Sequence, residues 1–241
     1  MIDLIIENRF NKLFEEWNQR KGYREGLHAS TVLAPSDGNT RFCYREVVFG
    51  NFYRPQESWV PVNVLRIFLE GWHVHEKWQK LFVDSGIAEC VEKTRNSELW
   101  KLMHTPDAII VLNHQRFVVE IKSMSTNQFV NLNKAPSNAV NQAQLYMYFT
   151  GIPDAIILVE DKNSQQFKVF TIEFDLEIVL PYLSRLQRIA EFIEKFSENR
   201  LPKRIPQCGG GIGPRFQRCP FSRICFLSRD EREEFKKEKQ Q

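Results

Sequence analysis

The sequence predicts an α/β protein with a central sheet flanked by helices, and three observations support this fold class. Apolar residues recur at helical spacing in residues 2–20, 62–84 and 176–199. Short runs rich in Val, Ile and Phe lie between the last two of these segments and are bounded by turn residues, as strands usually are. The 241-residue chain is 42% hydrophobic and 26% charged, a composition that allows one large core.

The predicted elements follow one another in a simple order. Residues 23–61, after the first helix, are rich in turn residues and are expected to be irregular. A proline opens the helix before the last two strands, and Gly151 closes it. Beyond the helix of residues 62–84, we expect a strand, a hairpin, a helix and two further strands, at 87–93, 104–122, 136–149, 154–160 and 166–174.

We expect the whole chain, residues 1–241, to form one domain. Its three parts are an N-terminal helix with a cysteine element, a core, and a basic tail with three cysteines, at residues 1–61, 62–199 and 200–241.

Charge and cysteine usage restrict the setting of the protein. The net charge of +3 is mild, but seven basic residues and no acid lie between Arg200 and Arg229. Such a segment suits a phosphate backbone, although a solvated basic surface is the simpler alternative.

Five cysteines, an odd number, favour a reducing compartment and a metal rather than disulfides. No signal peptide or span of ~20 apolar residues is visible, so we expect a cytoplasmic protein with no membrane partner.

The hairpin HTPDAIIVLNHQRFVVEIK carries charges where packing residues are expected. With a two-residue turn at Asn113-His114, the numbers of facing residues sum to 227, and Asp107 lies opposite Glu120. Two carboxylates roughly 5 Å apart repel each other unless a cation lies between them, and oxygen ligands favour Mg²⁺ or Mn²⁺. Lys122 follows on the same face, where it could activate water. The alternative to a metal site, to which we give about equal weight, is that Asp107, Glu120 and Lys122 form a solvated, salt-bridged face of the hairpin.

Two further patterns lie on predicted helices. Gln144 and Tyr148 form a Q-x-x-x-Y pair and share a helical face. Gly71 and His75 form a G-x-x-x-H pair, in which His75 lies on the apolar stripe. Each pair alone is more often structural, as a core tyrosine with a surface glutamine or as a buried histidine.

Taken in order, G-x-x-x-H, P-D, E-x-K and Q-x-x-x-Y resemble the motif series of the RecB-like branch of the PD-(D/E)XK nuclease superfamily. The resemblance implies a restriction-endonuclease-like core with a mixed sheet. It also implies that the metal is held by His75, Asp107, Glu120 and the carbonyl of Ile121, and that the catalytic residues are Asp107, Glu120, Lys122, Gln144 and Tyr148.

The tail adds a second resemblance, to iron–sulfur nucleases of the AddB and CRISPR-associated exonuclease types. One cysteine precedes the core and three follow it, with Cys43-x-Arg45 and a C-x5-C final spacing as in those families. The wide interval between Cys208 and Cys219 departs from their pattern, so zinc and unmetallated thiols stay as alternatives to a 4Fe–4S cluster. The implied ligands are Cys43, Cys208, Cys219 and Cys225.

The resemblance predicts a metal-dependent DNA nuclease, preferably an exonuclease on single strands or frayed ends. A structure- or sequence-specific endonuclease and a non-catalytic DNA-binding module are the alternatives. A helicase, a recombination protein or a CRISPR integrase could be the protein partner. DNA contacts are predicted for the basic residues of the tail, namely Arg215, Arg218 and Arg223.

Overall fold

A computed structural model of the chain describes residues 2–20, 27–33, 42–53, 62–196, 201–211, 219–228 and 230–232. The chain divides into two compact units, which are described separately. Unit 1 comprises Met1–Gly22, Val60–Ser97 and Met103–Pro181. Unit 2 comprises Tyr23–Trp59, Glu98–Leu102 and Tyr182–Gln241. That the whole chain forms one nuclease domain remains a prediction.

The predicted helices and strands are present near their predicted places, and several short elements that were not predicted accompany them. The helices are α1 (Ile2–Arg20), α2 (Ala29–Val32), α3 (Tyr44–Phe52), α4 (Val62–Asp84), α5 (Thr126–Val130), α6 (Ser137–Thr150), α7 (Leu176–Glu194), the 3-10 helix η1 (Pro206–Gly211) and α9 (Ser222–Phe226). The strands are β1 (Leu27–His28), β2 (Ala88–Val91), β3 (Arg95–Ser97), β4 (Leu102–His104), β5 (Ala108–Leu112), β6 (Gln115–Met124), β7 (Asp154–Asp161) and β8 (Phe167–Glu173).

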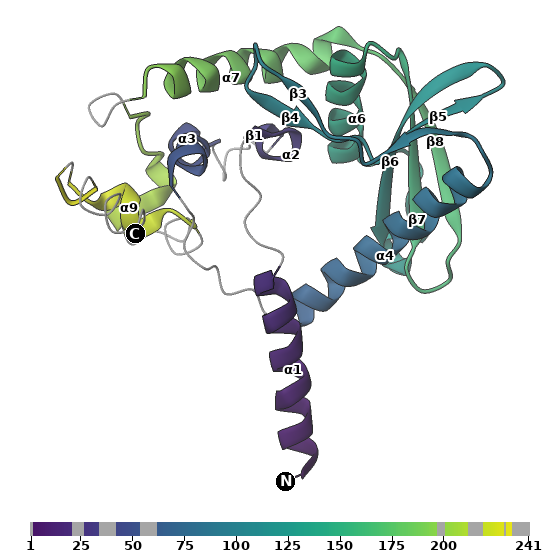
Figure 1. Cartoon of the computed structure of the whole chain (residues 1–241), viewed down its shortest axis with the longest axis horizontal. Coiled ribbons are helices and arrows are strands. Elements are labelled where there is room, and N and C mark those ends of the chain that lie inside the picture. The colour runs from purple at the N-terminus through teal and green to yellow at the C-terminus, as the bar shows by residue number, and fades with distance from the viewer. Residues whose placement is uncertain are drawn as a thin grey trace. The chain divides into compact units, whose positions relative to one another are not determined.

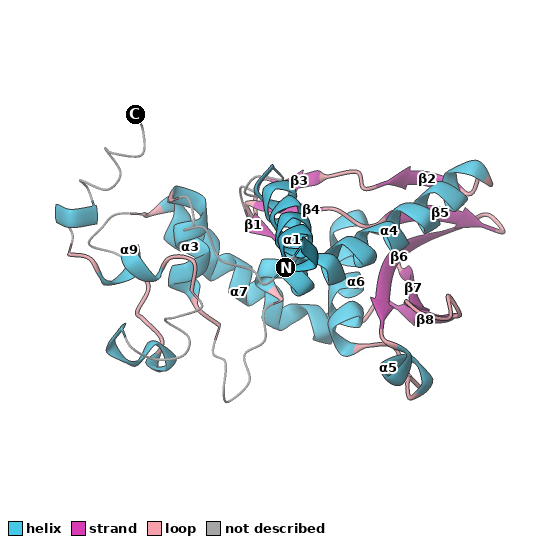
Figure 2. Cartoon of the chain, turned by 90° about the horizontal axis from the view of Figure 1, so that it is seen from below, coloured by secondary structure: helices cyan, strands magenta, loops and turns pink. Residues whose placement is uncertain are grey.

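Unit 1 is built on a mixed sheet of five strands in the order β2-β5-β6-β7-β8 (Figures 1 and 2). The pair β6 and β7 is parallel, and the other neighbours are antiparallel. The parallel pair needs a crossover connection, which α5 and α6 provide. The predicted α/β fold with a helix-flanked mixed sheet is therefore confirmed.

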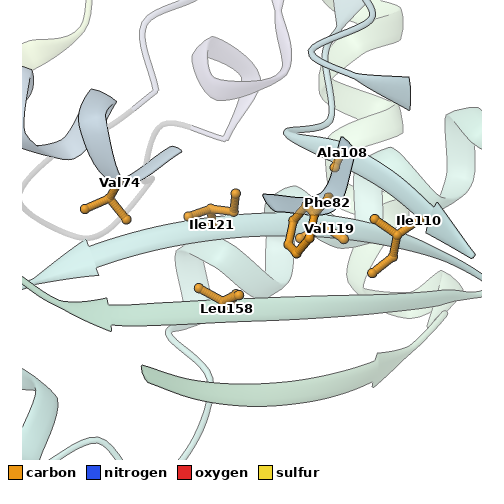
Figure 3. Close-up of a cluster of buried hydrophobic side chains, with 7 residues drawn as sticks. All are labelled: Val74, Phe82, Ala108, Ile110, Val119, Ile121 and Leu158. Carbon is orange, nitrogen blue, oxygen red and sulfur yellow. The ribbon is translucent and has the colours of Figure 1, made fainter. Parts of the chain in front are cut away.

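The core of unit 1 forms where α4 packs on the sheet (Figure 3). Val74 and Phe82 of α4 lie against Val119 and Ile121 of β6 and against Leu158 of β7. Ile121 faces α4, so its neighbours Glu120 and Lys122 point to the opposite face, where α6 packs against β6 and β7. Because Val119 and Ile121 are packed against α4 on one face of β6, Glu120 and Lys122 are fixed on the opposite face.

One expectation about unit 2 was wrong. Part of the region predicted to be irregular forms helix α3, which buries Val47, Val48 and Phe49. Its sequence, YREVVFGNF, contains a glycine and β-branched residues, which lower intrinsic helix propensity. Burial of its apolar face therefore overrides local propensity.

No helix in the described part of the chain is long and apolar enough to cross a membrane.

Candidate active site and cysteine cluster

The hairpin of β5 and β6 has the register expected from the sequence. Leu112 pairs with Gln115, and Ala108 pairs with Val119, so the residue numbers sum to 227. Both turn residues have positive φ angles, 49° for Asn113 and 66° for His114, as a type I′ turn requires. Asp107 immediately precedes β5, and the same register places it opposite Glu120.

Asp107 is held by contacts on both of its carboxylate oxygens. The backbone N–H of Ile121 donates to Oδ2 at 2.7 Å, and His75 Nδ1 lies 3.2 Å from Oδ1. Burial lowers the pKa of His75, but the hydrogen bond to Asp107 and the charge of that carboxylate outweigh burial and raise it. His75 and the backbone N–H of Ile121 therefore both contact the carboxylate of Asp107.

Glu120 is the buried acid of the site, with 1% of its surface exposed. Lys122 Nζ lies 2.5 Å from its Oε1, while Oε2 is buried and has no hydrogen-bond partner among the described residues. Burial raises the pKa of Glu120, and the nearby charge of Asp107 raises it further. Lys122 offsets part of this effect, and a further cation near Oε2 would stabilise the ionised form.

Helix α4 passes close to β6 at Gly71. A Cβ built on Gly71 would lie 3.6 Å from Ser123 Oγ of β6, so a larger side chain would meet the strand. His75, four residues later, lies on the same side of the helix and extends to Asp107. The G-x-x-x-H pattern therefore combines a small residue, where α4 passes close to β6, with a histidine that contacts Asp107 one turn later.

The acids are paired with neighbouring side chains rather than arranged around a vacant coordination site. Among the described residues, no group of three or more His, Cys, Asp or Glu side chains is placed so that it could hold a metal ion. Instead, His75 contacts Asp107, and Lys122 contacts Glu120. The set of donors still fits a hard divalent cation, because it offers carboxylate oxygens, an imidazole and the unpartnered Glu120 Oε2.

The structure distinguishes two overlapping Q-x-x-x-Y pairs on α6. Gln144 and Tyr148 formed the predicted pair, but Gln144 is 1% exposed and its amide bonds to Glu173 O and to the N–H of Asp175, each at 2.8 Å. Gln142 accepts a hydrogen bond from Lys122 Nζ at 3.3 Å. Two residues along a helix rotate a side chain by about 200°, so only one pair can face the hairpin.

Sequence reasoning did not single out Gln142 or its partner Tyr146. Gln142 Nε2 lies 3.0 Å from the hydroxyl of Tyr146, four residues later. The same sequence, QAQLYMY, contains both pairs, and nothing in their spacing separates them. The contact with Lys122 is the feature that does. Tyr148 is 37% exposed and packs near Phe149 and Phe174.

Unit 2 brings the four predicted cysteines together. Cys43, Cys208, Cys219 and Cys225 line one small cavity, and all are free thiols. Burial raises the pKa of Cys43 to about 11 and that of Cys219 to about 12. Arg45 Nη1 lies 3.9 Å from Cys225 Sγ, so the Cys-x-Arg element contributes to the same cluster. Among the described residues, no three or more of these side chains are placed so that they could hold a metal ion, and burial favours the neutral thiols.

The remaining predicted site residues lie in the tail. Arg223 is on α9 and is exposed. Arg215 and Arg218, both predicted to contact DNA, lie outside the described residues.

No family model matches the sequence, and no curated protein matches it. The structure is similar to the alkaline exonuclease LHK-Exo from Laribacter hongkongensis, with a TM-score of 0.51 and 14% identity over 70% of this chain and 87% of that one. The structure of LHK-Exo in complex with dAMP gives a TM-score of 0.52 and 15% identity over 70% and 88% of the two chains. A phage-related exonuclease from Haemophilus somnus 129PT gives a TM-score of 0.49 and 14% sequence identity over 72% of this chain and 95% of that chain. At these identities the likeness to LHK-Exo shows a shared fold, consistent with a restriction-endonuclease-like core.

Proposed function

We propose that this chain is a metal-dependent deoxyribonuclease whose active site lies at the open end of the β5–β6 hairpin. One observation carries the proposal. Glu120 is buried beside Asp107 with Oε2 unpartnered among the described residues, although a lysine and a histidine are within reach of the two acids. A site that served only for folding would be more stable with a neutral or apolar residue there.

The metal ligands in this proposal are Asp107, Glu120, His75 and the Ile121 carbonyl. Oxygen donors and one imidazole suit Mg²⁺ or Mn²⁺. A divalent cation bound there would neutralise phosphate charge and lower the pKa of an attacking water. His75 and the Ile121 N–H orient the Asp107 carboxylate through the contacts at 3.2 and 2.7 Å.

Lys122 is the proposed residue that positions the attacking water and stabilises developing charge. Its ammonium is held between Glu120 Oε1 and Gln142 Oε1, at 2.5 and 3.3 Å. Tyr146 supports Gln142 from the next turn of α6. We assign Gln142 and Tyr146 this orienting role in place of Gln144 and Tyr148, because Gln144 is fully engaged by the backbone of Glu173 and Asp175.

An exonuclease that acts on single-stranded or frayed DNA ends is the preferred mode. The likeness to an alkaline exonuclease supports this preference. An endonuclease of the resolvase or restriction type would use the same chemistry. The protein partner of such a nuclease would be a helicase, a recombination protein or a CRISPR integrase.

Cleavage of end-labelled linear DNA and of a closed circle, with Mn²⁺ or EDTA, tests the proposal. We expect Mn²⁺-dependent shortening of linear DNA that spares the circle. Asp107→Ala and Lys122→Ala should each lower the rate at least 100-fold, the usual effect of losing a charge-stabilising or proton-transfer group. Asp84→Ala is the matched control, because Asp84 is an exposed acid of α4 that pairs only with Lys80 in the contacts described.

Nicking of the circle would indicate the endonuclease alternative. Binding of DNA without cleavage under any of these conditions would contradict the nuclease proposal and support a DNA-binding module.

We further propose that Cys43, Cys208, Cys219 and Cys225 bind a 4Fe–4S cluster, with Zn²⁺ as the alternative. Their convergence on one cavity supports this assignment. Protein purified without oxygen should show a brown colour with about four irons, or about one zinc if zinc is bound. Cys225→Ser should reduce the bound metal, whereas Cys90→Ser, at a cysteine outside the cavity, should not. Metal-free wild type that retains its stability would contradict the assignment.

A further inference from the structure

Gln79, which no motif points to, makes a set of contacts that centres on the main chain of Asp107. Gln79 is 8% exposed and lies on α4, four residues after His75 and on the same helical face. Its Nε2 lies 3.1 Å from the backbone carbonyl oxygen of Asp107. One helix face therefore reaches Asp107 twice, at the carboxylate through His75 and at the carbonyl through Gln79.

The same carbonyl is also held from the sheet side. The backbone N–H of Glu92, just after β2, donates to Asp107 O at 3.2 Å, and Glu92 Oε1 accepts from Gln79 Nε2 at 3.2 Å. Gln79, Glu92 and the Asp107 carbonyl thus form a closed triangle of hydrogen bonds that joins α4, the end of β2 and the start of β5.

Glu92 adopts an uncommon backbone conformation to make these contacts. Its φ angle is 41°, in the left-handed region that residues with side chains rarely occupy. Strained residues persist where their surroundings hold them, and they are concentrated at functional sites. Here the strain accompanies a hydrogen bond to the residue that opens the candidate active site.

We propose that Gln79 is a positioning residue that, with Glu92, holds the main chain of Asp107 so that its carboxylate is presented to the divalent cation. The proposal rests on the nuclease function proposed above. Gln79 makes no direct contact with the ion or with DNA in this role. Residues that orient metal ligands in this way typically change metal affinity or activity 10- to 100-fold when they are replaced.

The test measures Mn²⁺ binding by calorimetry without DNA, alongside the melting temperature and kcat and KM on linear single-stranded DNA. Gln79→Leu keeps the volume of the side chain but removes the donor, and we expect Mn²⁺ affinity to fall about 10-fold and kcat to fall with KM little changed. Lys80→Ala, the next residue of α4, is the control, because Lys80 is exposed and pairs with Asp84.

A double variant separates positioning from packing. Gln79→Glu with Glu92→Gln restores a hydrogen bond between the two side chains but leaves no donor at position 79 for the Asp107 carbonyl. We expect the double variant to stay as weak as Gln79→Leu in Mn²⁺ binding. Recovery of wild-type affinity would overturn the proposal, because the contact between positions 79 and 92 would then suffice.

The outcomes for the wild type and the variants are distinguishable. Wild type that binds no Mn²⁺ in an Asp107-dependent manner would overturn the nuclease function together with this inference. Wild type and Gln79→Leu that bind Mn²⁺ equally would overturn only the role of Gln79.

If Gln79→Leu is too unstable to assay, the rate of amide exchange at Glu92 in Gln79→Asn tests the role of Gln79 instead. Exchange faster than in wild type is expected, and unchanged exchange would overturn the proposal.

Discussion

At the residue scale, the charged side chains of the hairpin are largely buried, with 13% of the Asp107, 1% of the Glu120 and 27% of the Lys122 side chain exposed. Lys122 neutralises one oxygen of Glu120, and His75 faces one oxygen of Asp107. Each acid is compensated by one basic group, yet Glu120 keeps a buried oxygen without a partner among the described residues. Buried groups that lack partners destabilise a fold, so their presence favours a functional role over a structural one.

His104 lies three residues before Asp107 and illustrates a buried residue without an assigned function. It is 3% exposed, its ring centroid lies 5.2 Å from that of Phe149, and its Nδ1 has no partner among the described residues. Burial, with a smaller contribution from the charge of Arg95, lowers the pKa of His104 to about 4. The folded protein therefore favours the neutral imidazole.

We predict that His104 makes the protein sensitive to acid. Because its pKa is lower in the folded state than the ordinary 6.5, its contribution is present above pH 6.5 and is lost as the pH falls towards 4. The loss amounts to about 2–3 kcal/mol of unfolding free energy. Urea unfolding at pH 7 and pH 4.5 should show a smaller difference for His104→Phe than for wild type. His114→Asn, at an exposed turn, should leave the difference unchanged, and an unchanged His104→Phe would contradict the assignment.

At the element scale, two glutamines of α6 that are two residues apart, Gln142 and Gln144, make different kinds of contact. Gln144 connects the helix to the end of β8 through Glu173 O and the N–H of Asp175. Gln142 faces the hairpin and contacts Lys122. The rotation between successive helical positions separates a structural residue from a candidate functional one.

This separation predicts opposite phenotypes. Gln144→Ala should lower the unfolding free energy by about 2–4 kcal/mol, because it leaves two backbone groups without partners. Gln142→Ala should change the unfolding free energy by less than about 1 kcal/mol and lower the cleavage rate about 10-fold or more. Chemical denaturation and single-turnover cleavage measure the two effects. A stable but inactive Gln144→Ala would favour the original assignment of Gln144 and Tyr148.

Helix α4 supplies a second prediction at this scale. Gly71→Ala should be tolerated or should stabilise the protein by up to about 1 kcal/mol, because the new Cβ would meet Ser123 Oγ at 3.6 Å, an ordinary contact. Gly71→Leu should push α4 from β6 and move His75 from Asp107. We expect weaker Mn²⁺ binding and at least 10-fold slower cleavage for Gly71→Leu only, measured beside the melting temperature. Equal activity of both variants would contradict this role of Gly71.

At the scale of the whole molecule, each of the two units contains one candidate chemical site. The hairpin site belongs to unit 1, and the cysteines belong to unit 2. In unit 2, Phe49 of α3 and Tyr53, which directly follows α3, pack with Phe221, Ile224 and Cys225, so the cavity lies within a hydrophobic cluster. A metal bound there would stabilise this cluster directly.

We therefore predict a local effect of metal removal. Anaerobic chelation or Cys225→Ser should speed amide exchange in α3 and α9, which flank the cavity. Exchange in β5 and β6 should stay within about two-fold of wild type, because unfolding free energies differ between cooperative units. Hydrogen exchange followed by mass spectrometry measures both regions in one sample. Equal loss of protection in both would contradict a role confined to unit 2.

The sequence by itself determined the order of the main helices and strands from residue 62 to residue 194, the hairpin register and the position of Asp107 opposite Glu120. Local rules suffice for these features. A two-residue turn with positive φ angles at Asn113 and His114 leaves one register, and strand periodicity then places Glu120 and Lys122 on one face. Helix α3 was not predictable in the same way, because burial against distant residues overrides its weak propensity.

Only the tertiary structure decided which side chains of a helix meet the site. Gln142 and Gln144 belong to equivalent patterns in the sequence, and the packing of α6 on β6 and β7 brings only Gln142 to Lys122. Gln79 carries no sequence signal at all, because its partners are the side chain of Glu92 and the carbonyl of Asp107, and a backbone carbonyl is present at every residue. Periodicity defines the faces of an element, whereas long-range packing determines which face meets which neighbour.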